Sequence, residues 1–310
     1  MTKRKHGKPK AYRYSFKIAE SVEKTADSKV RQCIVDETSD ELIHAMNRMI
    51  NKHDLTFEEA LHALDIINLI VRDFIQLHGD RLFGDDAAIV CGIGQIDEYP
   101  VVIVAEQKGR DIKEKIQRNF GSPHPEGYRK ALRIFYFAEK FSLPIVCIVD
   151  TPGAYPGVGA EERGIAESIA RNLREMALLE TPIVVLILGE GCSGGAIAIA
   201  LGDRILMMEN AYYSVISPEG CASILWRDSA RAKDAAEAMK ITAQDLDKFK
   251  IIDRIIPEPL GGAHRDWSVT AQNIKQAIIE TLDELLKIPI AKLVQQRVEK
   301  YRRMGVQRES

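Results

Sequence analysis

DTPGAYPGVG (residues 150–159) and GEGCSGGA (residues 189–196) are the two stretches that decide the fold. Each directly follows a short run that is almost entirely apolar, 144–149 in one case and 182–188 in the other. Such runs are typical of strands buried on both faces of a parallel sheet. Ligands of open α/β sheets bind at the carboxyl ends of the strands. We therefore predict that both turns lie at one functional edge of a sheet.

The same alternation of short apolar runs and longer amphipathic ones extends outward from these turns. Further strands are expected at 87–96, 101–106, 205–208, 212–215 and 251–256, and helices at 126–141, 160–179 and 194–201. The strand–strand–helix rhythm predicts an α/β fold with a largely parallel sheet covered by helices.

The segments flanking this region differ from it in composition. Residues 1–19 carry seven Lys or Arg, and the first acidic residue is Glu20. An apolar stripe at three- and four-residue steps, running from Leu61 to Phe74, predicts helix up to Gly79. We divide the chain into a basic N-terminal arm at 1–37, a helical extension at 38–78, a core at 79–266 and C-terminal helices, interrupted at Pro289, at 267–310.

Composition excludes several classes of protein. The 310 residues include 43 Lys and Arg against 45 Asp and Glu. The chain as a whole therefore lacks the positive net charge that is typical of nucleic-acid-binding proteins. No apolar run approaches the roughly 18 residues that a membrane span requires. The five cysteines form no C-x-x-C pair, which argues against a zinc ribbon and fits a reducing compartment such as the cytoplasm. There is no P-loop motif, and we expect no bound nucleotide and no metal on this chain.

A helix that begins at Gly194 and Gly195 presents unpaired backbone N–H groups at its positive end. Glycine leaves that backbone open to a ligand, because no side chain intervenes. The pair therefore predicts a site for developing negative charge, such as an oxyanion or enolate. Close packing of the helix against the sheet is the alternative explanation of the two glycines.

The stretch 191–195 also satisfies G-x-S-x-G, the nucleophile-elbow pattern of serine hydrolases. In that interpretation Ser193 is the nucleophile, His264 the base, and Asp245 or Asp253 the residue that orients the base. The pattern is short and arises by chance where glycines cluster, so this hypothesis is the minor one.

Three other features are given structural interpretations. Residues 237–240 (EAMK) are similar to a biotin-attachment sequence, but their surroundings favour helix, so Lys240 is predicted to be an unmodified helix-end lysine. Ser217 and Pro218 predict a capped helix start, with ligand contact as the alternative role of this segment. The basic residues from Lys108 to Arg118 are typical of a solvated helix face, with phosphate or partner contact as the alternative.

Long stretches closely resemble the carboxyltransferase α subunits of bacterial and plastid acetyl-coenzyme A carboxylases. They are LHGDR (77–81), QKGRDIKEKIQRNFG (107–121), PEGYRKALR (125–133), DTPGAYPGVGAEERG (150–164), IARNLREM (169–176), GEGCSGGA (189–196), YSVISPEGCASILW (213–226) and IIPEPLGGAHRD (255–266). The resemblance is nearly continuous from residue 64 to 266. Two departures are the basic N-terminus and Cys192, which stands where that family commonly has glycine.

This resemblance implies a crotonase-like (ClpP/crotonase) fold. It implies transfer of a carboxyl group from carboxybiotin, held on a separate carrier protein, to acetyl-coenzyme A, giving malonyl-coenzyme A. The partners implied are a carboxyltransferase β subunit in an α2β2 assembly, the biotin carboxyl carrier protein and biotin carboxylase, and zinc would belong to the β subunit alone. The cytoplasm is the expected location, or the plastid stroma in a eukaryote, although no clear transit peptide is present.

Carried over residue by residue, the resemblance assigns the oxyanion-hole amides for the biotin ureido oxygen to Gly194 and Gly195. It assigns the facing wall of the biotin pocket to Gly153, Ala154, Tyr155 and Ser193. The unusual N-terminus leaves one further alternative, a non-catalytic paralogue that keeps the fold.

Overall fold

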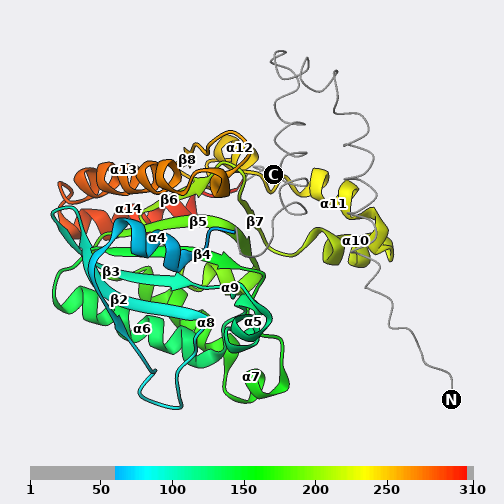
Figure 1. The fold of residues 1–310 in the computed structure, drawn as a ribbon, viewed down its shortest axis with the longest axis horizontal. Coiled ribbons are helices and arrows are strands. Elements are labelled where there is room, and N and C mark those ends of the chain that lie inside the picture. Colours follow the sequence, from blue (N-terminus) through cyan, green and yellow to red (C-terminus); the bar gives the residue numbers. More distant parts are fainter. Residues whose placement is uncertain (1–59, 306–310) are drawn as a thin grey trace.

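The computed structural model describes residues 60–305. The predicted basic arm at 1–37 and the helix predicted at 38–59 lie outside these residues. The described part is an α/β structure in which one sheet is covered by helices on both faces (Figure 1).

The sheet contains eight strands among the described residues: β1 (Arg72–Leu77), β2 (Ile89–Ile96), β3 (Tyr99–Glu106), β4 (Ile145–Thr151), β5 (Ile183–Cys192), β6 (Arg204–Met208), β7 (Tyr212–Ser214) and β8 (Arg254–Ile256). Their order is β1-β2-β3-β4-β5-β6-β8, and β7 pairs with the end of β5. The first two pairs are antiparallel, and all pairs from β3 to β8 are parallel. The predicted largely parallel sheet is therefore confirmed.

The central strands are apolar because both of their faces are covered. Every residue of β4 is buried, as are the first six of β5. Parallel strands of this kind require a helix on each side, which explains why their sequence does not alternate with period two. Strands β3, β4 and β5 pair in parallel as neighbours, so their carboxyl ends meet at one edge.

Helices cover the sheet in two layers (Figure 1). The structure contains α4 (Ala63–Ile70), α5 (Ile112–Gln117), α6 (Pro125–Lys140), α7 (Val158–Glu162), α8 (Ile165–Met176), α9 (Ser193–Ile197), α10 (Pro218–Trp226), α11 (Ala232–Met239), α12 (Ala243–Lys248), α13 (Trp267–Leu285) and α14 (Ile290–Arg302). Helix α6 packs on β2, β3 and α8, whereas α13 packs on α4, β5 and β8. Helices α10 and α11 extend away from the sheet (Figure 1). Within residues 60–305 no helix combines the length and apolarity needed to cross a membrane.

One helix prediction is wrong. Helix was expected through residue 78, but α4 ends at Ile70 and residues 72–77 form β1, antiparallel to β2. The reason is a tertiary contact. A Cβ added at Gly92 in β2 would lie 2.5 Å from the Phe74 ring, so only glycine leaves room for this side chain of β1. The local apolar periodicity had predicted that Phe74 belongs to a helix.

The single helix predicted at 160–179 is two helices, α7 and α8. Gly164 separates them with φ = 78°, in the left-handed region that glycine adopts without steric cost.

Candidate active site

The first glycine-rich turn leaves the carboxyl end of β4. Thr151 stabilises it: the Thr151 hydroxyl donates to the Gly121 carbonyl at 2.7 Å and accepts from the Gly153 N–H at 3.0 Å. The turn is thereby attached to the 107–121 segment, which forms an adjacent part of the same edge.

The second turn joins β5 to α9 and lies against the first. Ser193 is exposed and has φ = 58°, an uncommon value for a residue other than glycine. Gly195 approaches the other turn so closely that an added Cβ would lie 2.5 Å from Ala154 N and 2.6 Å from Gly153 C. The structure thus brings together Gly153, Ala154, Ser193, Gly194 and Gly195, the residues that the sequence assigned to one site.

The amides of Gly194 and Gly195 belong to the first turn of α9, so neither has an acceptor within the helix. Among residues 60–305 no other group accepts a hydrogen bond from them. Within residues 60–305 both amides thus lack an acceptor; Gly194 is half-buried and Gly195 is buried, and the packing of Gly195 is a second and independent reason for glycine there.

Tyr155, the remaining predicted wall residue, is held by contacts outside the turns. Its N–H donates to the Pro123 carbonyl at 3.0 Å, and its ring stacks on His124 with centroids 4.1 Å apart. Arg163 contacts His124 in turn, with Nη2 3.2 Å from Nδ1. Tyr155 therefore has a fixed position beside the first turn.

The residues of the hydrolase hypothesis do not form a triad. Ser193 Oγ makes no hydrogen bond to His264 or to any other residue in the described range. Asp245 takes part in the cap of α12 with Thr242, and Asp253 accepts from Lys300 and from the Ile205 N–H. Both carboxylates thus have structural partners elsewhere.

A cluster of charged side chains, which sequence reasoning did not identify, lies under the two turns. Lys108 Nζ is 2.8 Å from Asp150 Oδ1 and 2.7 Å from Glu190 Oε2. Glu106, the last residue of β3, is fully buried, and its Oε2 accepts from the Asp150 N–H at 3.2 Å. The sequence did contain one indication of this cluster. Glu106, Asp150 and Glu190 each stand at the end of an apolar strand.

The electrostatics of this cluster separate its carboxyl groups. Burial raises the pKa of Glu106 well above its ordinary value, and the neighbouring Asp150 raises it further. Burial alone would also raise the pKa of Asp150, but Lys108 and other hydrogen-bond donors outweigh it and hold the pKa of Asp150 below its usual range. Burial opposes the charge of Lys108, yet Asp150 and Glu190 raise its pKa. Glu106 is thus the neutral member of the cluster.

Glu106→Gln is expected to change how stability depends on pH. In the folded protein Glu106 keeps a proton that the unfolded chain releases above about pH 4.3. The free energy of unfolding therefore falls as the pH rises, by up to about 1.4 kcal/mol per pH unit, until the pH passes the pKa of folded Glu106. The variant lacks this term, and its amide oxygen can still accept from Asp150. Urea unfolding from pH 4 to 8 should show equal stability at the acidic end and a growing advantage of the variant above it.

The matched control for that experiment is Glu167→Gln on the exposed face of α8. Its stability should stay within about 0.5 kcal/mol of the parent at every pH. Parallel curves for Glu106→Gln and the parent would contradict the assignment of a buried neutral carboxyl.

The basic run is less solvated than predicted. The Lys108 side chain is only 20% exposed, Arg110 pairs with Asp65, and Arg118 pairs with Glu114 at 2.8 Å. Lys240 does end helix α11, and Ser217 caps α10 by accepting from the Gly220 N–H at 3.1 Å, as expected. Within residues 60–305, no group of three or more His, Cys, Asp or Glu side chains is arranged to hold a metal ion.

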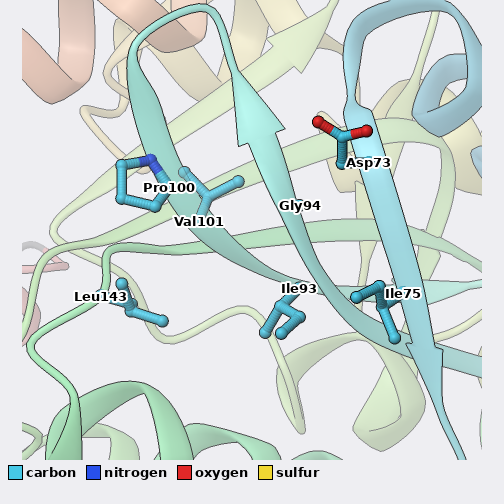
Figure 2. A pocket seen from close by; sticks show the side chains of 7 residues that line it. All are labelled: Asp73, Ile75, Ile93, Gly94, Pro100, Val101 and Leu143. Atoms are coloured by element: carbon cyan, nitrogen blue, oxygen red, sulfur yellow. The ribbon is translucent and has the colours of Figure 1, made fainter.

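An apolar hollow lies beside strands β1, β2 and β3 (Figure 2). It is lined by Asp73, Ile75, Ile93, Gly94, Pro100, Val101 and Leu143. Pro100 and Leu143 are near the amino ends of β3 and β4, whereas the predicted site is at their carboxyl ends. None of the predicted site residues lines it.

Comparison with solved structures identifies the class of fold. Transcarboxylase 12S with methylmalonyl-coenzyme A bound matches 76% of this chain with a TM-score of 0.60 and 21% identity, and the chain spans 44% of that protein. A Pseudomonas malonate decarboxylase hetero-tetramer in complex with coenzyme A matches 70% of this chain and 86% of its own with a TM-score of 0.58 and 18% identity. The fold is the crotonase-like fold of carboxyltransferases, as predicted.

Sequence relatives identify the family. The family model described as acetyl co-enzyme A carboxylase carboxyltransferase-like matches residues 21–305. The acetyl-coenzyme A carboxylase carboxyl transferase subunit alpha of Geobacter sulfurreducens is 61% identical over 247 residues, covering 80% of this chain and 77% of the relative. The protein of the same name from Methylococcus capsulatus is 56% identical, with coverage of 80% and 77%. The chain therefore belongs to the acetyl-coenzyme A carboxylase carboxyltransferase α-subunit family, and is a transferase component.

Proposed function

We propose that the chain transfers the carboxyl group of carboxybiotin, presented by a separate carrier protein, to acetyl-coenzyme A, forming malonyl-coenzyme A. The observation that carries this proposal is that the two glycine-rich turns pack against each other at the amides of Gly194 and Gly195. The chain is also 61% identical to a protein named carboxyl transferase subunit alpha. The name of that relative indicates carboxyl transfer, and the Gly194 and Gly195 amides are groups suited to this reaction.

The residues present fit a planar group with a negatively charged oxygen. A Cβ added at Gly194 would meet only Ile169 Cδ1, at 3.5 Å, and one at Gly153 would first meet Ser193 Cβ at 3.8 Å, so side chains do not crowd this surface. When bound, carboxybiotin would supply the carboxyl group, and its departure leaves negative charge on the ureido oxygen. The Gly194 and Gly195 amides stabilise that charge, and removing one such donor typically costs about 2.7–4 kcal/mol of transition-state stabilisation.

A partner subunit completes the site in this proposal. Large apolar side chains beside the two turns are exposed, namely Ile112 and Ile116 on α5, Phe120, and Val158 on α7. Exposed apolar clusters of this kind are typical of surfaces that another protein covers. We assign this surface to a zinc-bearing carboxyltransferase β subunit in an α2β2 assembly, which works with the biotin carboxyl carrier protein and biotin carboxylase in the cytoplasm. The named relatives above are bacterial, in accord with that location.

The experiment that tests this function is reconstitution. The purified chain alone is expected to form no malonyl-coenzyme A from acetyl-coenzyme A and carboxybiotin. Addition of the β subunit encoded in the same genome should produce it, with both subunits eluting as one complex in size-exclusion chromatography. A complex that forms but transfers nothing would instead identify a non-catalytic paralogue. Activity of the chain alone would contradict the need for a partner.

The hydrolase alternative has its own test. A fluorophosphonate probe labels activated serines, and the proposal predicts no labelling of Ser193, since its hydroxyl has no base within the described residues. Labelling that disappears in Ser193→Ala would revive that alternative.

A further inference from the structure

A partly buried ion network joins the two glycine-rich turns at their bases. Lys108 bridges Asp150 and Glu190 at 2.8 and 2.7 Å, and the Glu190 N–H donates to the same Asp150 oxygen at 3.0 Å. The three side chains are 20%, 6% and 23% exposed, respectively. Because β4 and β5 are neighbours, this network cross-links them just before their last paired residues, Thr151 and Gly191.

The two acidic residues of the network are close in sequence to the glycine-rich turns whose backbone the network would position. Asp150 is three residues before Gly153, and Glu190 is five residues before Gly195. Between these ends the turns touch without space for a Cβ at Gly195, and a Cβ at Gly189 would lie 2.8 Å from Asp150 Oδ1. A change in the separation at the base therefore displaces the Gly194 and Gly195 amides.

Lys108 is itself held in place from the other side. The Leu64 N–H at the start of α4 donates to Gln107 Oε1 at 2.7 Å, and Gln107 Nε2 donates to the Lys108 carbonyl at 2.7 Å. The ammonium group thus extends from a fixed backbone toward the ends of β4 and β5.

The titratable groups facing this network come from five elements. They are Asp150 on β4, Glu190 on β5, Glu106 on β3, Tyr212 on β7, and His62 beside α4, whose Nδ1 is 3.8 Å from Asp150 Oδ2. Since Glu106 is neutral, two carboxylates face one ammonium. Removal of that ammonium leaves two like charges in a poorly solvated place, where they repel each other and favour uptake of a proton.

We propose that Lys108 is a positioning residue of the carboxyltransferase site, whose ion pairs with Asp150 and Glu190 set the spacing of the two glycine-rich turns and hence the placement of the Gly194 and Gly195 amides. This inference rests on the proposed function. It gives Lys108 a role that requires no contact with substrate.

The test uses the full chain assembled with its β subunit. Lys108→Met is expected to lower kcat for malonyl-coenzyme A formation by about 100-fold at pH 8, the loss associated with a 1 Å displacement of catalytic groups, with little change in the KM for acetyl-coenzyme A. The deficit should shrink toward pH 6, because a protonated carboxyl pair no longer repels. Lys108→Met/Glu190→Gln, which restores the charge balance, should recover activity relative to the single variant at pH 8.

Two controls make the result specific. Lys108→Arg keeps the charge and should retain more activity than Lys108→Met, and Lys292→Met, an exposed change on α14, should match the parent. If Lys108→Met does not assemble, Glu190→Leu replaces it and should lose more kcat than Glu190→Gln, which still accepts from Lys108. Full activity of Lys108→Met, or a deficit that is the same at every pH and not relieved in the double variant, would overturn the proposal. An inactive parent complex would instead overturn the proposed function.

Discussion

Gly195→Ala is expected to lower carboxyl transfer by the assembled enzyme by about 100-fold or more. The added Cβ would lie 2.5 Å from Ala154 N and 2.6 and 2.9 Å from Gly153 C and Cα. Backbone atoms cannot rotate away as a flexible side chain does, so the two turns must separate and their amides lose their alignment. The measurement is the rate of malonyl-coenzyme A formation, with assembly checked by size-exclusion chromatography.

Gly84→Ala is the matched control, because an added Cβ there would meet no atom within 4 Å and Gly84 lies outside the two glycine-rich turns. It should therefore lose much less activity than Gly195→Ala. Equal losses in the two variants would show that close packing of the turns is not what distinguishes Gly195.

Loss in Gly195→Ala does not by itself demonstrate that an amide stabilises charge. Replacing Gly195 by glycolic acid removes its N–H and adds no Cβ. If the amide stabilises a developing oxyanion, this ester variant should lose about 100- to 1,000-fold in kcat. Near-normal turnover of the ester variant would contradict that role and leave packing as the only function of the glycine.

Sequence predicted the features that depend on local pattern. The apolar runs at 144–149 and 182–188 correspond to β4 and β5, and the glycine-rich stretches after them are the turns of one edge. Both follow from rules that act within a few residues, namely burial on two faces and strand ends that run into turns. Juxtaposition of Gly153 with Gly195 could then be inferred, because neighbouring parallel strands end at the same edge.

Features that depend on distant partners could not be predicted in this way. Strand β1 has an apolar spacing that also suits a helix, and only the glycines of β2 reveal that Phe74 packs across a strand pair. Lys108 likewise belongs to a basic run typical of a solvated face. Its burial is determined by Asp150 and Glu190, which are 42 and 82 residues away in the chain.

Arg297 on α14 is another residue whose role depends on distant partners. Its guanidinium is fully buried and uses all five N–H groups: it donates to both Asp203 oxygens at 2.9 Å and to the carbonyls of Met176, Leu179 and Thr181 at 2.8 Å. Met176 is the last residue of α8, Leu179 and Thr181 lie between α8 and β5, and Asp203 lies between β5 and β6. Arg297 therefore connects the C-terminal helix to the carboxyl-terminal end of α8 and to the sheet.

Arg297→Met is expected to lower the free energy of unfolding by about 3–5 kcal/mol, because it leaves Asp203 as a buried charge without its partner and three carbonyls without donors. Arg303→Met, at the C-cap of the same helix, removes only an exposed pair with Glu299 and should cost about 0.3–0.5 kcal/mol. Urea unfolding of the two variants measures the difference. Arg297→Met/Asp203→Asn removes the stranded charge as well and should be more stable than the single variant. If instead Arg297→Met costs less than about 1 kcal/mol, water reaches these groups in solution and α14 is not fixed by this contact.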